Sequence, residues 1–238
     1  MPQKPQKVST SMFPHFIFDV LACLAALTVG LWQKTKLNLP DNPHINGIYI
    51  FVLLSGTVIG GYGFGTWNLI ISHTPILAHS ILGALVGGIV FIELYKMARH
   101  ICAPTGAAYA LPFCMLGFVG RIGCFLGGLD DMTYGIPSNL PWAVDFGDGI
   151  PRHPVQLYES LSMLLMMVAC VVWLKRDLAS YLRYAFPIVV GFYALQRFFW
   201  EFLKPYHTVV AGFNLFHILC LGLMIYSSIL IYRRRSNV

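Results

Sequence analysis

Arg121 has the residue type and the neighbours of a phosphate-binding group. It lies between Gly120 and Gly123, where an apolar stretch of the chain ends. A guanidinium binds phosphate through two parallel hydrogen bonds, and flanking glycines let a ligand approach the backbone closely. An arginine at a membrane boundary can also simply extend its charge to the lipid headgroups. We favour the phosphate-binding interpretation.

A second arginine lies inside another apolar segment. Tyr193, Arg197 and Glu201 are four residues apart, so on a helix they share one face over about 12 Å. Ionisable residues within a membrane span usually face the bundle interior and have partners. The pattern is compatible with a structural Arg–Glu pair. We prefer the alternative, a second phosphate-binding arginine that is oriented by Glu201 and assisted by the hydroxyl of Tyr193.

A polar stretch over 117–160 separates the segments that carry the two arginines. His153 near its end has the chemistry of a general base at neutral pH, but it could equally anchor the start of the next helix. Gln156, Tyr158 and Glu159 follow and would form the first helical turn, where the acidic side chain suits the helix dipole.

The same stretch is rich in acidic residues. Asp130, Asp131, Asp145 and Asp148 are four of the chain's ten Asp and Glu residues. They could bind a divalent cation, but their spacing matches no calcium loop, so we interpret them as solvated loop charges and expect no metal and no cofactor. Cys124 could be a thiolate nucleophile near an arginine, or a small packing residue.

The elements that must position these residues are membrane-spanning helices. The chain has 238 residues, 57% hydrophobic and 11% charged, whereas a soluble domain carries roughly 25% charge. Stretches of about 20 apolar residues can cross the hydrocarbon layer. The sequence predicts an all-α polytopic membrane protein in one domain (1–238), with spans over 16–32, 45–71, 76–95, 104–119, 157–174, 184–202 and 213–232. Its net charge of +6 is better explained by membrane topology and anionic lipid than by a nucleic-acid partner.

The distribution of basic residues predicts the orientation. Ten of the sixteen Lys and Arg residues follow the first, third, fifth and seventh spans, which places the N-terminus outside and the C-terminus in the cytoplasm. The stretch 120–153 then forms a loop on the outer side, periplasmic in a bacterial inner membrane. Non-helical backbone at membrane depth is tolerated only when it is buried in protein or lines a wet cavity, so we expect this loop to be partly re-entrant and to form a site.

Small residues predict how two of the spans pack. Glycines recur at a spacing of four at 56 and 60, at 61 and 65, and at 83 and 87. Such pairs allow helices to approach closely, and we prefer this interpretation to one in which they leave room for a lipid chain. Near the start of the first span, His15 and Asp19 are also four apart and could pair.

Three motifs together resemble the prolipoprotein diacylglyceryl transferase family. The segment GRIGCF (120–125) is similar to the family's GRxGNF signature, and RHPVQLYES (152–160) is similar to its RHPSQLYE segment. Tyr193, Arg197 and Glu201 match its YxxxRxxxE helix. The order of the motifs and the seven spans agree as well, over most of the chain from about residue 78.

The resemblance implies a reaction and a set of site residues. The family transfers the diacylglyceryl group of phosphatidylglycerol to the thiol of a lipobox cysteine in a prolipoprotein signal peptide, and releases glycerol phosphate. Its functional residues carry over to Arg121, His153, Gln156, Tyr158, Glu159, Tyr193, Arg197 and Glu201.

The chain also departs from the family pattern. Where the family has a histidine in its third span this chain has Leu82, with His79 one helical turn away, and the Asn of GRxGNF is Cys124. The base is therefore His153, His79 or a loop aspartate. The acceptor could be a different nucleophile, as in a divergent paralogue, or the protein could bind lipid without catalysis.

Overall fold

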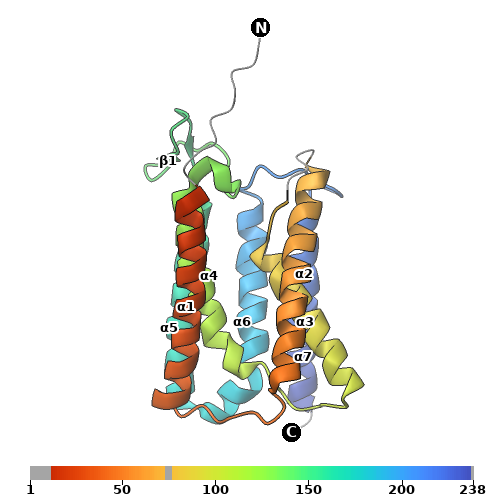
Figure 1. Ribbon diagram of the computed structural model, residues 1–238. Helices are drawn as coiled ribbons and strands as arrows, with labels where there is room; N and C mark the ends of the chain where they lie inside the picture. The colour runs from red at the N-terminus through yellow and green to blue at the C-terminus, as the bar shows by residue number, and fades with distance from the viewer. Residues whose placement is uncertain (1–11, 73–76, 237–238) are drawn as a thin grey trace.

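The computed structural model describes residues 12–72 and 77–236, and this part of the chain forms a bundle of seven long helices (Figure 1). Each helix is long and apolar enough to cross a membrane. They are α1 (Met12–Lys36), α2 (Gly47–Ile71), α3 (Ile81–Ala98), α4 (Ala107–Gly127), α5 (Val155–Arg176), α6 (Leu178–Glu201) and α7 (Leu215–Ser236). The prediction of an all-α polytopic membrane protein is confirmed.

The fourth helix extends further than the sequence predicts. A span was expected over 104–119, with a loop from residue 120, but α4 continues to Gly127. Glycine-rich sequence favours a loop only weakly, because a packed helix overrides propensity. The helix ends where Gly128 adopts a φ of 61°, a conformation that glycine reaches without strain. Arg121 and Cys124 therefore lie on a rigid helix, not in a loop.

The connection between α4 and α5 lies at one end of the bundle, the same end as the start of α1 (Figure 1). It contains the short 3-10 helix η1 (Gly128–Asp131) and a two-stranded antiparallel sheet of β1 (Val144–Asp145) and β2 (Pro151–Arg152). The last turns of α1, α3, α5 and α7 carry the basic residues and lie at the other end. The loop and most of the positive charge are thus on opposite sides of the bundle.

Two other helix starts differ from the sequence prediction. The third span was expected from residue 76, which lies outside the described residues, but α3 begins at Ile81. Ser80 caps it by accepting a hydrogen bond from the Gly83 nitrogen at 3.2 Å. α6 begins at Leu178 and not at 184, because Asp177 caps it and accepts from the Ser180 nitrogen at 3.0 Å. His79 consequently precedes α3.

The predicted close approach of glycine-bearing helices is confirmed for α2 and α3. A Cβ added to Gly60 would lie 2.4 Å from the Gly83 carbonyl oxygen, and one on Gly87 would lie 2.2 Å from that of Gly56. No side chain fits in these positions, so backbone packs on backbone. α4 packs against α1, α5 and α6, and α6 packs against α7. This arrangement places α4 beside the two helices that carry the other site residues.

Candidate active site

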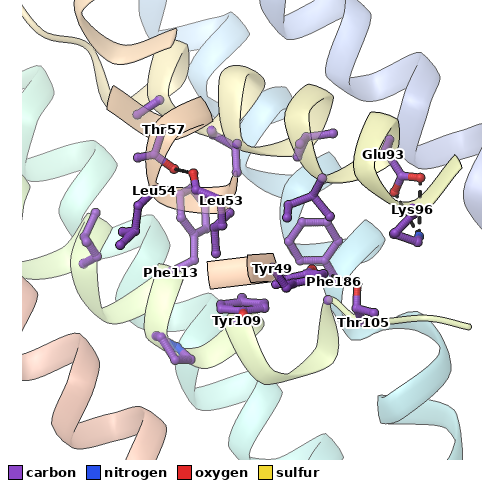
Figure 2. Close-up of a pocket in the computed structure, with 18 of the residues that line it drawn as sticks. Tyr49, Leu53, Leu54, Thr57, Glu93, Lys96, Thr105, Tyr109, Phe113 and Phe186 are labelled. Carbon is purple, nitrogen blue, oxygen red and sulfur yellow. Dashed lines mark hydrogen bonds and ion pairs between the residues drawn. The ribbon is translucent and has the colours of Figure 1, made fainter. Parts of the chain in front are cut away.

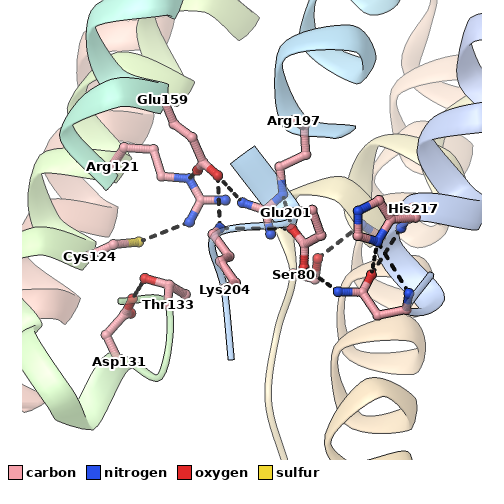
Figure 3. Close-up of polar contacts among 12 residues, drawn as sticks. Ser80, Arg121, Cys124, Asp131, Thr133, Glu159, Arg197, Glu201, Lys204 and His217 are labelled. Atoms are coloured by element: carbon pink, nitrogen blue, oxygen red, sulfur yellow. Dashed lines mark hydrogen bonds and ion pairs between the residues drawn. The ribbon is translucent and has the colours of Figure 1, made fainter. Parts of the chain in front are cut away.

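One buried carboxylate is the centre of the candidate site. Glu159, in the first turns of α5, forms ion pairs with three cations that come from three parts of the chain (Figure 3). Its oxygens lie 2.5 Å from Arg121 Nε, 2.5 Å from Arg197 Nη1 and 2.8 Å from Lys204 Nζ. The Glu159 side chain is only 1% exposed. The two arginines singled out in the sequence therefore meet in space, joined by Glu159, which the sequence had indicated by its motif and by its place in the first turn of a helix.

Small residues direct Arg121 into the bundle. A Cβ on Gly123 would lie 2.4 Å from Phe18 Cβ, and one on Gly120 would lie 3.9 Å from Ala22 Cβ. The glycine face of α4 thus packs directly against α1. Arg121 is 5% exposed and points toward α5 instead. The flanking glycines act here through helix packing, which is a different use from the ligand access expected from the sequence.

The predicted face of α6 exists and is buried. Tyr193, Arg197 and Glu201 are each about 2% exposed or less. Arg197 Nε lies 3.0 Å from Glu201 Oε2, so the i,i+4 ion pair forms. Arg197 also reaches Glu159, so both roles that the sequence left open, structural pairing and participation in an anion site, are compatible with its position.

The sequence analysis missed three residues of this region, namely Lys204, Asn214 and His217. Lys204 follows α6 and reaches Glu159. Asn214, just before α7, donates to Glu201 Oε1 at 3.1 Å, and its own Oδ1 accepts from the His217 nitrogen at 3.0 Å. Lys204 is three residues beyond Glu201, which was a usable signal, but a lysine after a span resembles an ordinary interfacial charge. Asn214 offered no such signal.

The five ionised groups, Arg121, Glu159, Arg197, Glu201 and Lys204, form what we call the ionic cluster. Three cations face two carboxylates, and the side chains are between 0% and 6% exposed. Burying an uncompensated charge is costly. The surplus positive charge therefore favours a bound anion.

Unpartnered polar atoms surround this cluster. Gln156 is fully buried, and in the described part of the chain no hydrogen-bond partner is found for either of its amide atoms. The same holds for the hydroxyl of Tyr193. Buried polar groups normally have partners. Both side chains belong to the predicted site, one turn before Glu159 and Arg197 respectively, so they are suited to bind the polar part of a ligand.

Two of the loop aspartates stabilise the loop through hydrogen bonds. Asp145 Oδ1 accepts from the nitrogens of Gly147 and Gly149 at 2.8 and 3.0 Å. Asp148 binds Arg152 through two bonds of 2.7 Å, and this pairing lowers the pKa of the Asp148 carboxyl. These carboxylates hold the loop and the β1–β2 turn in place.

The other two aspartates, Asp130 and Asp131, lie in η1. Asp131 accepts a hydrogen bond from the Thr133 hydroxyl. Among residues 12–72 and 77–236, no three His, Cys, Asp or Glu side chains are grouped so that they could hold a metal ion.

His153 contacts the loop through its backbone and its ring. Its nitrogen donates to the Ile136 oxygen at 3.1 Å, and its own oxygen accepts from the Gly135 nitrogen at 3.2 Å. Its Nδ1 lies 3.4 Å from the Tyr158 hydroxyl, which accepts from Trp142 Nε1 at 2.7 Å. These contacts fit the anchoring interpretation of His153, and they place Tyr158 in the same loop-anchoring group.

His79, in the segment before α3, pairs with an acidic residue of α1. Its Nε2 lies 4.0 Å from Asp19 Oδ2 of α1, and both side chains are about half exposed. The sequence suggested His15 as the partner of Asp19, but the side chain of His15 lies outside the described residues. Leu82, where the resembling family has its histidine, is fully buried in the apolar core and can exchange no proton.

Cys124 lies close to the cluster. Arg121 Nη1 donates to its Sγ at 3.7 Å, and the side chain is 6% exposed. The sulfur thus helps to hold the second edge of the guanidinium. Its burial fits the packing interpretation better than that of an accessible nucleophile.

A cavity of about 300 Å³ lies between α2, α3 and α4 (Figure 2). Its walls are mostly apolar and include Phe113, while Glu93 and Lys96 line its far end, near the last turn of α3. At its near end, Ile81 Cδ1 lies 3.8 Å from where a Gly120 Cβ would be. Ile81, which lines the cavity, thus packs against the stretch of α4 that carries Arg121, and the cavity extends from there along α3 through the membrane-spanning part of the bundle.

Fold and site together define a multi-pass membrane protein with a buried cluster of three cations and two carboxylates near one end of its helices, and with an apolar cavity between its helices. A model of the prolipoprotein diacylglyceryl transferase family matches residues 16–233. The chain belongs to this family, as the three sequence motifs had indicated.

Individual relatives agree with this assignment. A phosphatidylglycerol–prolipoprotein diacylglyceryl transferase of Methylococcus capsulatus is 29% identical over 214 residues, which cover 79% of this chain and 78% of that protein. The enzyme of the same name from Wolbachia pipientis is 29% identical over 205 residues, 77% and 76% of the two chains. That of Rhodospirillum centenum is 35% identical over 176 residues, 65% and 62%.

Proposed function

We propose that this protein transfers the diacylglyceryl group of phosphatidylglycerol to the thiol of a prolipoprotein cysteine. The observation that carries the proposal is the meeting of Arg121 and Arg197 on Glu159, in a buried cluster with one surplus positive charge. A phosphodiester with an uncharged alcohol carries one negative charge and complements that surplus. The names of the relatives, which specify phosphatidylglycerol and prolipoprotein, support the choice of substrates.

In the proposed reaction, the negative charge that develops on the departing phosphate lies at the ionic cluster. The thiol sulfur attacks the glyceryl carbon that bears the phosphate, and a carbon–sulfur bond forms. The carbon–oxygen bond breaks, and its electron pair leaves with the phosphate oxygen as glycerol phosphate. Arg121 and Arg197, already held in place, stabilise the charge that the phosphate gains.

We assign the thiol proton to His79. Its Nε2 lies 4.0 Å from Asp19 Oδ2, and its half-exposed side chain is accessible to a substrate. Three of the four loop aspartates are engaged within the loop: Asp131, Asp145 and Asp148. The described contacts of His153 anchor the same loop.

The orientation proposed is the one that the basic residues favour, with the ionic cluster at the periplasmic leaflet of a bacterial inner membrane. The lipid would enter with its phosphate at the cluster and one acyl chain in the apolar cavity, one of whose lining residues, Ile81, packs against α4 at Gly120. The acceptor signal peptide would approach from the same side, where the 128–154 loop lies.

The experiment is an assay with detergent-purified protein, phosphatidylglycerol and a lipobox peptide. Release of glycerol phosphate together with a peptide heavier by one diacylglyceryl group is expected. Release without peptide modification would indicate another acceptor nucleophile. Absence of release, with lipid binding retained, would overturn the enzymatic proposal in favour of a lipid-binding protein.

A further inference from the structure

Lys204 has no exposed side-chain surface and is held by acidic groups of two helices. Its Nζ lies 2.8 Å from Glu159 Oε1 and 4.0 Å from Glu201 Oε2. It follows α6 in the connection to α7, and Figure 3 shows it pointing into the cluster beside Glu159. A lysine in this setting has given up its hydration entirely, which requires compensation.

The structure already provides Glu159 with sufficient positive charge without this lysine. Arg121 and Arg197 bind its two oxygens at 2.5 Å each, and Arg197 also pairs with Glu201. Without Lys204, two arginines would balance two glutamates. The lysine is therefore the group that makes the buried cluster cationic, and a purely structural role would not require this surplus.

We propose that Lys204 is the third cation of the phosphate site, and that its charge makes the site select a headgroup of net charge −1. The proposal rests on the proposed function, since it assigns a further ligand to the same lipid phosphate. An ammonium has three donors, so Lys204 can contact a phosphate oxygen while it remains near Glu159. A zwitterionic headgroup would add its own positive charge to the cluster and bind less well.

The charged groups that face Lys204 are Arg121 from α4, Glu159 from α5, and Arg197 and Glu201 from α6. Burial and Arg197 lower the pKa of Lys204 to about 8, and Glu159 partly opposes this change. A lysine with this pKa is mostly charged at neutral pH and loses its proton as the pH rises through about 8. An anion that binds beside it favours the charged form, so its affinity should fall over the same range.

The test measures binding of phosphatidylglycerol in detergent micelles from about pH 7 to about pH 9. Wild-type affinity should fall at the alkaline end, and Lys204→Arg should remove that fall because an arginine keeps its proton. Lys204→Gln should bind phosphatidylglycerol roughly 10- to 100-fold more weakly at neutral pH, which corresponds to the loss of one hydrogen bond to a charged group. It should also discriminate less between phosphatidylglycerol and phosphatidylethanolamine.

Lys175→Gln serves as the control, because Lys175 is an exposed residue in the last turn of α5. Melting of each lipid-free variant verifies folding, and Lys204→Arg alone decides the question if the Gln variant does not fold. The proposal would be overturned if the affinity of Lys204→Arg for phosphatidylglycerol fell at alkaline pH as the wild-type affinity does. It would also be overturned if Lys204→Gln bound the lipid within about twofold of wild type. Because the readout is lipid binding, its failure is separate from a failure of diacylglyceryl transfer.

Discussion

Replacing Glu159 by Gln should destabilise the protein more than the loss of any exposed ion pair. The change keeps the side-chain shape but removes the charge that Arg121, Arg197 and Lys204 share at 2.5, 2.5 and 2.8 Å. Removing one partner of a buried ion pair costs about 3–5 kcal/mol. In a chain of this length each kcal/mol lowers Tm by about 2–4 °C, so the expected decrease is about 6–20 °C.

The assay is thermal unfolding of the purified variant in detergent, with and without phosphatidylglycerol. The lipid should narrow the gap between Glu159→Gln and wild type, because its phosphate supplies the missing negative charge. Asp41→Asn is the matched control: Asp41 pairs with Lys34 at 2.7 Å, but both side chains are more than half exposed, so Tm should change by at most about 4 °C.

A Glu159→Gln variant that melts within the range of this control would refute the central role given to the carboxylate. A large loss of Tm without extra stabilisation by lipid would refute the link between the cluster and the phosphate.

Four further perturbations test other parts of the reasoning. Arg121→Lys keeps the charge but loses the planar fork, so kcat/KM for glycerol phosphate release should fall at least about tenfold; near-normal turnover would exclude the phosphate contact. His79→Gln should slow transfer by roughly 10²- to 10⁴-fold with lipid binding retained, whereas equal loss of both would indicate packing. Gly60→Ala should cost about 1–3 kcal/mol, since its Cβ would meet a backbone oxygen of α3 at 2.4 Å, while Gly63→Ala, with nothing within 4 Å, should melt near wild type. Pairing with Arg152 lowers the pKa of Asp148, so the pair stabilises the loop fully above the ordinary carboxyl pKa and loses this effect as the pH falls through the lower pKa of the folded state. The rate of proteolysis of the 128–154 loop should therefore stay constant near neutrality and increase only below about pH 4.

Hydropathy predicted the architecture well because the bilayer imposes a single length and a single polarity on each span. Boundaries were harder to predict. Glycines next to Arg121 suggested a loop, yet α4 continues through them to Gly127 because α1 packs against that face. α3 begins at Ile81, later than the apolar residues before it predict, because Ser80 caps the first turn of the helix.

By itself the sequence determined the seven spans, the family motifs and the identity of both arginines, since these depend on composition and on spacing within one helix. Only the tertiary structure decided which groups share a partner. Glu159 lies 38 residues from Arg197 and 45 from Lys204 along the chain, and their meeting depends on how α4, α5 and α6 pack. Such long-range contacts leave no periodic trace in a sequence, and this is why the pairing of Lys204 with Glu159 emerged only from the fold.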